Sequence, residues 1–215
     1  MTVCVFASSS SRINNEYAVV ASHLGSLLAR AGIDVVFGGG GIGLMGRLAD
    51  SVIENGGKIT GVIPSFMKDE GWDHSNVKEM ILTSDMGERK KKMFEMSDAV
   101  IALPGGIGTL EELTEAITLK QLSLYDGPII ILNTLGYYNS LLGFLENMIN
   151  NQFLRLEHKG IWEIVNTPEE VIIAYNEKKL DLHAWIKVKT NVREGGEIVN
   201  KLVETTVGRV LFNQH

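Results

Sequence analysis

The alternation of two apolar patterns along the chain constrains its fold more than any other feature. Short runs of apolar, β-branched residues alternate with longer segments in which apolar residues recur at helical spacing. The clearest run, residues 99–103, is almost wholly apolar and precedes a glycine-rich turn and a helical pattern. Such a run is typical of a parallel strand covered on both faces. The pattern therefore predicts an α/β fold, a Rossmann-like doubly wound parallel sheet with helices on both faces.

The expected elements follow from the same periodicities. We expect strands at residues 2–7, 33–37, 58–63, 77–83, 99–103, 128–132 and 161–165. We expect helices at residues 15–31, 44–54, 86–96, 110–124, 137–149 and from 168 to 175, while residues 65–76 show no clear period. Ligands of such folds bind beyond the carboxyl ends of the strands, so the residues that directly follow strands are the informative ones.

Composition limits the classes of partner. The formal net charge is −6, which gives no reason to expect nucleic-acid binding. No apolar run reaches the ~18 residues of a membrane span, so we expect no membrane association. The five histidines lie outside metal-ligand spacing, so we expect no metal site. The single cysteine, Cys4, lies in an apolar run that indicates a buried strand position. Together with the lack of a charged leader, this favours a cytoplasmic location.

The segment from Leu103 to Glu112 carries the strongest functional signal. Three glycines follow an apolar strand and open a helix, whose free N–H groups and dipole form an anion site. A phosphate is the natural ligand, but no lysine follows as in a P-loop, so a nucleoside triphosphate is not indicated. A competing interpretation is structural, because Thr109 and Glu112 match a capping box. In the functional interpretation, Glu112 lies one turn from the phosphate and faces the sugar.

Two further segments follow strands. Gly38, Gly40 and Gly43 match G-x-G-x-x-G, but they follow the second strand, and no acidic residue lies about 20 positions on, so we discount a dinucleotide site. We expect a second glycine-rich floor of the same pocket, or simply a tight strand–helix turn. The hydroxyls of Ser8–Ser11 either bind phosphate or ribose, or cap the next helix.

Arg89 begins a basic run early in the helix expected at 86–96. Such a run usually forms a solvated helix face. At the ligand-binding edge of the sheet, however, a fixed guanidinium can hold a phosphate or orient a carboxylate.

Together these segments resemble the Lonely Guy family of phosphoribohydrolases. The family pattern P-G-G-x-G-T-x-x-E corresponds to Pro104–Glu112, and a preceding Met-x-x-Arg-Lys corresponds to Met86–Lys90. The G-G-G-x-x-G-L-M-G element ends at Gly46, and Gly61–Pro64 also fits. The resemblance covers roughly residues 2–166.

The resemblance implies release of a free base from a nucleoside 5′-monophosphate, leaving ribose 5-phosphate. The substrates known for such enzymes are AMP and cytokinin ribotides, which carry an N6-modified adenine. It implies that Arg89 and Glu112 are catalytic, and that the enzyme is a homodimer or larger homo-oligomer with its pocket near the subunit interface. The reaction needs no cofactor, and nothing suggests the pyridoxal chemistry implied by the label lysine decarboxylase that homologues often carry. The expected substrate contacts are Ser8, Gly40, Glu70, Met86, Lys90, Gly105, Gly106, Ile107, Gly108, Thr109, Glu111 and Thr118.

The C-terminal segment fits this resemblance less well. We expect a nucleotide-binding domain at residues 1–178 and an appended tail at residues 179–215, since the resemblance fades after about residue 166. The tail resembles a fragment of the bacterial RNA polymerase β′ subunit without its aspartate cluster, which predicts weak packing of residues 181–215. The alternative is an ordinary family-specific tail that packs on the domain or on a partner subunit.

Three other functions compete with the hydrolase. A non-catalytic nucleotide-binding module of the same fold would use Glu112 only as a helix cap. A DNA-processing protein is disfavoured by the acidic charge. A nicotinamide oxidoreductase is disfavoured by the missing ribose-binding acid.

Overall fold

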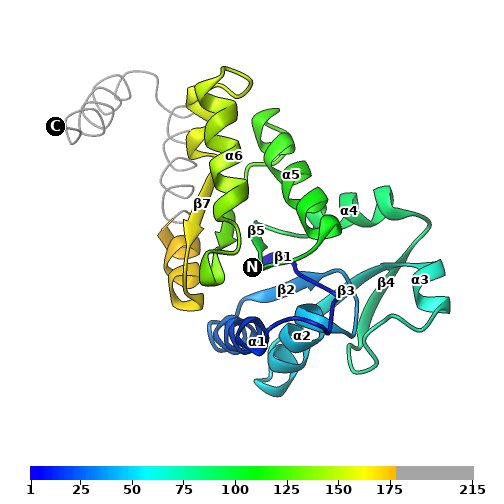
Figure 1. The fold of residues 1–215 in the computed structure, drawn as a ribbon. Coiled ribbons are helices and arrows are strands. Elements are labelled where there is room, and N and C mark those ends of the chain that lie inside the picture. The colour runs from blue at the N-terminus through cyan, green and yellow to red at the C-terminus, as the bar shows by residue number, and fades with distance from the viewer. Residues whose placement is uncertain (178–215) are drawn as a thin grey trace, which may run out of the picture. The chain divides into compact units, whose positions relative to one another are not determined.

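The computed structural model describes residues 1–177 and contains one parallel seven-stranded sheet (Figure 1). The strands are β1 (Thr2–Phe6), β2 (Asp34–Phe37), β3 (Ile59–Pro64), β4 (Glu79–Thr83), β5 (Ala99–Ala102), β6 (Ile129–Leu132) and β7 (Trp162–Val165). The α-helices are α1 (Asn15–Arg30), α2 (Gly43–Glu54), α3 (Ser65–Asp69), α4 (Met86–Glu95), α5 (Ile107–Gln121) and α6 (Asn139–Asn150). Two 3-10 turns are η1 (Thr134–Gly136) and η2 (Leu156–Gly160), and a further helix runs from 168 to 177, where the described residues end.

The strand order β4-β3-β2-β1-β5-β6-β7 confirms the predicted doubly wound sheet. Every adjacent pair is parallel, with β1 at the centre. The chain winds outward from β1 to β4 and then returns to place β5 on the other side of β1. The order therefore reverses between β1 and β5, where folds of this class bind ligands at the carboxyl ends of the strands.

The two faces of the sheet are covered by different helices, because successive side chains of a strand point to opposite faces. On one face, Val3 and Val5 pack in a core with α1, α2 and the helix that begins at 168. On the other, Cys4 and Phe6 pack with α4, α5 and α6 (Figure 1). Cys4 is fully buried, as predicted, and burial raises the pKa of its thiol.

Two differences from the sequence analysis concern helices α3 and α5. Residues 65–69 form the short helix α3, whose five residues are too few to show a period. Helix α5 begins at Ile107, three residues before the expected start. The N-cap of α5 is Gly106, without a side-chain capping bond, so the competing interpretation of a capping box with Thr109 at the N-cap is wrong.

The tail hypotheses concern residues 179–215, which lie outside the described residues. Met1–Tyr175 form one compact unit. None of the helices among residues 1–177 is both long enough and apolar enough to cross a membrane.

Candidate active site

A cleft of about 590 Å³ opens at the carboxyl ends of the central strands, across the point where strand order reverses. The loops after β1, β2, β3 and β5 and the first turns of α4 and α5 form its walls. Its polar lining comprises Ser8, Ser9, Ser10, Arg89, Thr109, Glu111 and Glu112. Its apolar lining includes Ile42, Met45, Ile63, Met67, Trp72, Met86 and Ile107.

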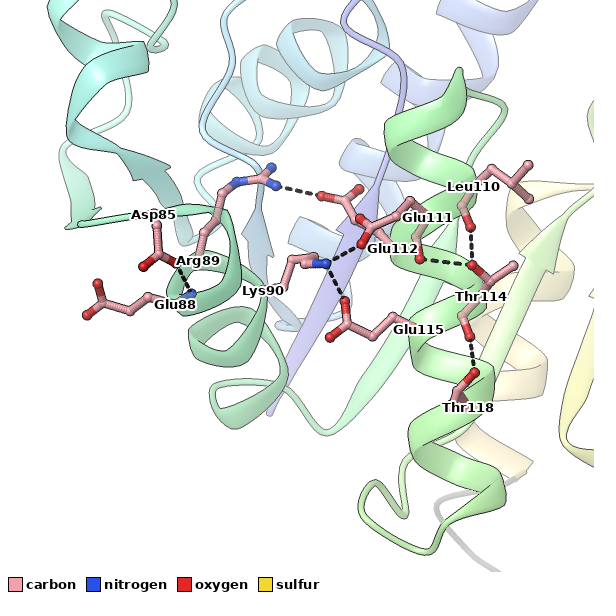
Figure 2. A network of polar contacts seen from close by, with 10 residues as sticks. All are labelled: Asp85, Glu88, Arg89, Lys90, Leu110, Glu111, Glu112, Thr114, Glu115 and Thr118. Atoms are coloured by element: carbon pink, nitrogen blue, oxygen red, sulfur yellow. Dashed lines mark hydrogen bonds and ion pairs between the residues drawn. The ribbon is translucent and has the colours of Figure 1, made fainter.

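A buried ion pair between Arg89 and Glu112 forms part of the cleft wall. Nη1 of Arg89 donates to Oε1 of Glu112 at 2.7 Å, and the two side chains are only 7% and 9% exposed. The side chains approach from different helices, Arg89 from α4 and Glu112 from α5 (Figure 2). The guanidinium also donates through Nε to the Val62 carbonyl at 3.0 Å and through Nη2 to the Gly38 carbonyl at 3.4 Å. These bonds fix the guanidinium, which in turn orients the carboxylate.

The first turn of α4 places Arg89 at the cleft. Asp85 is the N-cap and accepts a hydrogen bond from the Glu88 amide at 2.8 Å, while the Glu88 carboxylate accepts one from the Ser84 amide at 2.7 Å. These bonds lower the pKa of both carboxyls. Gly38 provides the space, because a Cβ there would collide with Nη2 of Arg89.

Burial dominates the electrostatics of Glu112. Removal from water raises the pKa of its carboxyl above the usual range, and the neighbouring Arg89 acts in the opposite direction. A carboxyl whose pKa lies closer to neutrality is better suited to exchange a proton with a substrate or water than one on the surface.

The start of α5 provides a site for an anion. The first N–H groups of a helix lack intrahelical partners, and Gly106, Ile107, Gly108 and Thr109 line the cleft in this turn. Thr109 is buried, and its side chain occupies the space that a Cβ at Gly105 would need. Gly105 itself is outside the cleft lining.

The glycine-rich loop between β2 and α2 packs closely against the segment Ser8–Ser11 at the cleft. Gly43 has a φ of +69°, and a Cβ there would lie 2.6 Å from the Ser8 carbonyl. The loop is held from outside, since the His74 amide donates to the Gly39 carbonyl at 2.9 Å and the Gly41 amide to the Trp72 carbonyl at 3.1 Å. Gly38 and Gly40 of this loop line the cleft, which favours the interpretation as a second floor of the pocket over that of a tight turn alone.

Besides Gly105, three of the predicted contact residues lie outside the cleft lining. Lys90 is outside the cleft lining and forms ion pairs with Glu111 and Glu115, the latter at 2.7 Å (Figure 2). Thr118 is exposed further along α5, where its hydroxyl donates to a backbone carbonyl within the helix. Glu70 is exposed at the C-terminus of α3, outside the cleft lining.

Sequence reasoning missed most of the apolar wall. Met67 and Trp72 belong to the segment without a clear period, and the sequence pattern places Met45 and Ile63 in a helix and a strand without indicating a contact with the cleft. Met45, Ile63 and Trp72 contact the glycine-rich loop across the fold, a tertiary relation that a local sequence pattern does not report.

The family comparison agrees with the motifs. The family model described as possible lysine decarboxylase matches residues 45–175. A cytokinin riboside 5′-monophosphate phosphoribohydrolase of Arabidopsis thaliana is 44% identical over 166 residues, covering 77% of each chain. A second Arabidopsis enzyme of the same name is 38% identical over 210 residues, covering 98% of this chain and 91% of its own. A probable phosphoribohydrolase of this kind from Oryza sativa subsp. japonica is 41% identical over 170 residues, covering 79% and 68%.

Solved structures agree with the fold. The molybdenum cofactor carrier protein of Chlamydomonas reinhardtii matches with a TM-score of 0.64 at 20% identity, covering 82% of this chain and 96% of its own. At this identity the likeness shows the fold alone.

The donor set of the cleft does not fit the decarboxylase description. Pyridoxal-dependent decarboxylases form a Schiff base with a lysine, and no lysine is found among the described residues that line the cleft. The relatives and the four motifs agree with each other instead, and the chain belongs to the family of the cytokinin riboside 5′-monophosphate phosphoribohydrolases.

Proposed function

We propose that the protein hydrolyses the N-glycosidic bond of a purine nucleoside 5′-monophosphate to the free base and ribose 5-phosphate. One observation carries the proposal. A buried carboxylate, Glu112, is held by Arg89 one helical turn beyond a helix N-terminus that no side chain caps, in the same cleft. This arrangement separates a site for the phosphate from a site for the chemistry.

The 5′-phosphate binds at the first turn of α5. The N–H groups of Ile107, Gly108 and Thr109 and the helix dipole favour a dianion there. The phosphate is remote from the bond that breaks, so its binding energy serves to position the ribose against Glu112. The neighbouring Ser8–Ser10 hydroxyls are available to the phosphate or the ribose.

Glu112 acts on the developing charge at the ribose. Cleavage of an N-glycosidic bond builds positive charge on the sugar, which a carboxylate can stabilise, as in glycoside hydrolysis. The same carboxylate can activate water, whose hydroxyl bonds to the anomeric carbon while its proton goes to the departing base. Arg89 orients the carboxylate and favours its ionised form.

The apolar wall receives the base. Met45, Met67 and Trp72 offer flexible thioethers and an aromatic face to a purine ring. An N6-prenyl group adds apolar surface, so this wall supports N6-modified adenine nucleotides as substrates beside AMP.

The alternative of a non-catalytic binding module depended on Glu112 serving as a helix cap. The cap of α5 is Gly106, and the Glu112 carboxylate bonds to Arg89 instead. The alternative of a non-catalytic binding module therefore loses the helix-cap role of Glu112 that supported it.

Self-association and location complete the proposal. The exposed large apolar side chains between residues 122 and 156 include Leu122, Leu124, Leu135, Phe144, Phe153 and Leu156, which supports a homodimer or larger homo-oligomer. Sedimentation should therefore give a mass above that of one chain.

A single, buried cysteine supports a cytoplasmic location, which cell fractionation would test.

The test of the proposal is product analysis. The purified protein is incubated with AMP or with isopentenyladenosine 5′-monophosphate, and base and ribose 5-phosphate are quantified by chromatography. We expect equimolar base and ribose 5-phosphate from at least one substrate. Binding of both nucleotides without base release would refute the proposal.

A further inference from the structure

Two adjacent tyrosines, Tyr137 and Tyr138, hold the carbonyl groups of the loop that precedes α5. The Tyr138 hydroxyl donates to the Leu103 carbonyl at 2.7 Å, and the Tyr137 hydroxyl donates to the Gly105 carbonyl at 2.6 Å. Between them, the Pro104 carbonyl accepts the backbone N–H of Ser8 at 3.3 Å. Three consecutive carbonyls are thus bound by donors from outside the loop.

The turn after β6 positions these tyrosines. The Tyr138 amide donates to the Asn133 side chain at 2.7 Å, and Leu135 adopts a left-handed conformation with a φ of +54°. The Tyr137 ring contacts the rings of Tyr17 and Tyr138 edge-to-face, with centroids 5.9 and 5.1 Å away. Tyr138 is buried, whereas Tyr137 is 46% exposed. Although Tyr137 is partly exposed, its two ring contacts and its bond to Gly105 restrain the position of its hydroxyl.

The hydrogen bond from Tyr137 to the Gly105 carbonyl also affects the N–H group of Gly106. The Gly105 carbonyl and the Gly106 N–H belong to one planar, trans peptide unit, so they point in opposite directions. Holding the carbonyl toward Tyr137 turns the Gly106 N–H away from Tyr137. The donated hydrogen bond also polarises the peptide, which strengthens this N–H as a donor. Gly105 has no Cβ, and the side chain of Thr109 fills that space, so the peptide is confined from the other side.

We propose that Tyr137 is a positioning residue for phosphate recognition, which orients the Gly105–Gly106 peptide so that its N–H serves the 5′-phosphate. Tyr137 is not among the residues lining the cleft, so it acts through the loop and not by touching the nucleotide. The inference rests on the proposed function, because it assumes that the phosphate binds at the start of α5.

The test compares Tyr137→Phe with Tyr17→Phe in the full-length protein. The first variant removes the hydroxyl that binds Gly105 and keeps the ring. The control, Tyr17→Phe, removes the hydroxyl of the ring that packs against Tyr137. No hydrogen bond of the Tyr17 hydroxyl is found among the described residues, whereas the Tyr137 hydroxyl donates to Gly105. Binding of ribose 5-phosphate is measured by titration calorimetry, and kcat and KM are measured for AMP.

We expect Tyr137→Phe to raise the Kd for ribose 5-phosphate roughly fivefold, the effect of one modest hydrogen bond, and Tyr17→Phe to leave it unchanged. We also expect a higher KM for AMP with kcat nearly unchanged, as when uniform binding is lost. A role in packing alone would instead move thermal unfolding and kcat.

Three outcomes would overturn the inference. Equal Kd values for wild type and Tyr137→Phe would show that the hydroxyl does not act on phosphate binding. Equal weakening by Tyr17→Phe would assign the effect to ring packing. Failure of the wild type to bind ribose 5-phosphate would contradict the assumed phosphate position and so the inference. The proposed hydrolysis is tested by a different measurement, because it is refuted only if no base is released.

Discussion

Replacing Arg89 by methionine would leave the Glu112 carboxylate buried without the guanidinium that pairs with it. The side chains of both residues are less than one tenth exposed, and their closest atoms are 2.7 Å apart. Breaking a buried pair from one side typically costs about 3–5 kcal/mol, because a charge stays buried and uncompensated. For a unit of this size, such a loss corresponds to a fall in Tm of roughly 6–20 °C.

The cost of Arg89→Met should depend on pH. Burial raises the pKa of Glu112 and Arg89 opposes this rise, so removing Arg89 should raise the pKa of Glu112 further. Over the interval between the unfolded and folded pKa values, the folded protein then binds more protons than the unfolded protein. Its stability falls as pH rises through this interval. We therefore expect a larger loss at about pH 8 than at about pH 5.

The assay is urea unfolding followed by circular dichroism, for Arg89→Met, Glu112→Leu and the double variant. Because an apolar pair can replace a buried ion pair at little cost, the double variant should be markedly more stable than the sum of the single losses predicts. Additive losses, or a loss independent of pH, would refute the coupling that we derive from the structure.

Three further predictions concern activity. Gly38→Ala should displace the Arg89 guanidinium, because the new Cβ collides with it, and lower kcat/KM by roughly 100-fold as in other cases of misplaced catalytic groups. Steady-state kinetics that match the wild type would contradict this reasoning. The rate of base release should rise with pH as Glu112 loses its proton. Because burial raises the pKa of Glu112, the pH–rate profile should reach half its maximum at a pH above the usual pKa range of carboxyl groups. A flat profile would argue against a titrating Glu112. Deletion of residues 179–215 should leave base release unchanged, because the cleft is built from residues 7–112, and a large loss in the same assay would assign the tail a role.

The strand–helix alternation predicted most of the architecture because it is a local property that survives packing. A parallel sheet covered on both faces needs apolar runs such as residues 99–103, and the chain shows them at regular intervals. The rule of right-handed crossovers predicts a doubly wound sheet but does not specify the order of its strands. Helix α3 escaped the prediction because its five residues are too short for periodicity.

The capping boxes show where sequence reasoning fails. Asp85 with Glu88, and Thr109 with Glu112, both have the spacing of a box, yet only the first pair caps its helix. The difference is tertiary. Arg89, 23 residues before Glu112, donates to this carboxylate, and Gly106 already occupies the N-cap position of α5. A local motif cannot report a partner that the fold brings from another helix.

The candidate site was predicted in part. The residues that follow strands converge on one cleft, as parallel topology requires, and these include Ser8, Gly40, Arg89 and Glu112. Lys90 was expected at the nucleotide, but α4 points it toward α5, where Glu111 and Glu115 share it. The start of this helix agrees with the prediction, so the direction of Lys90 depends on how α4 packs against α5, which is a tertiary property.

The most direct test of the account is base release from AMP and isopentenyladenosine 5′-monophosphate by Glu112→Gln beside Glu115→Gln. Both substitutions neutralise a carboxylate on α5, but Glu115 pairs with Lys90 outside the cleft lining. The account predicts that Glu112→Gln binds nucleotide yet releases no base, while Glu115→Gln stays active. Full activity of Glu112→Gln would contradict the central claim that this carboxylate performs the hydrolysis.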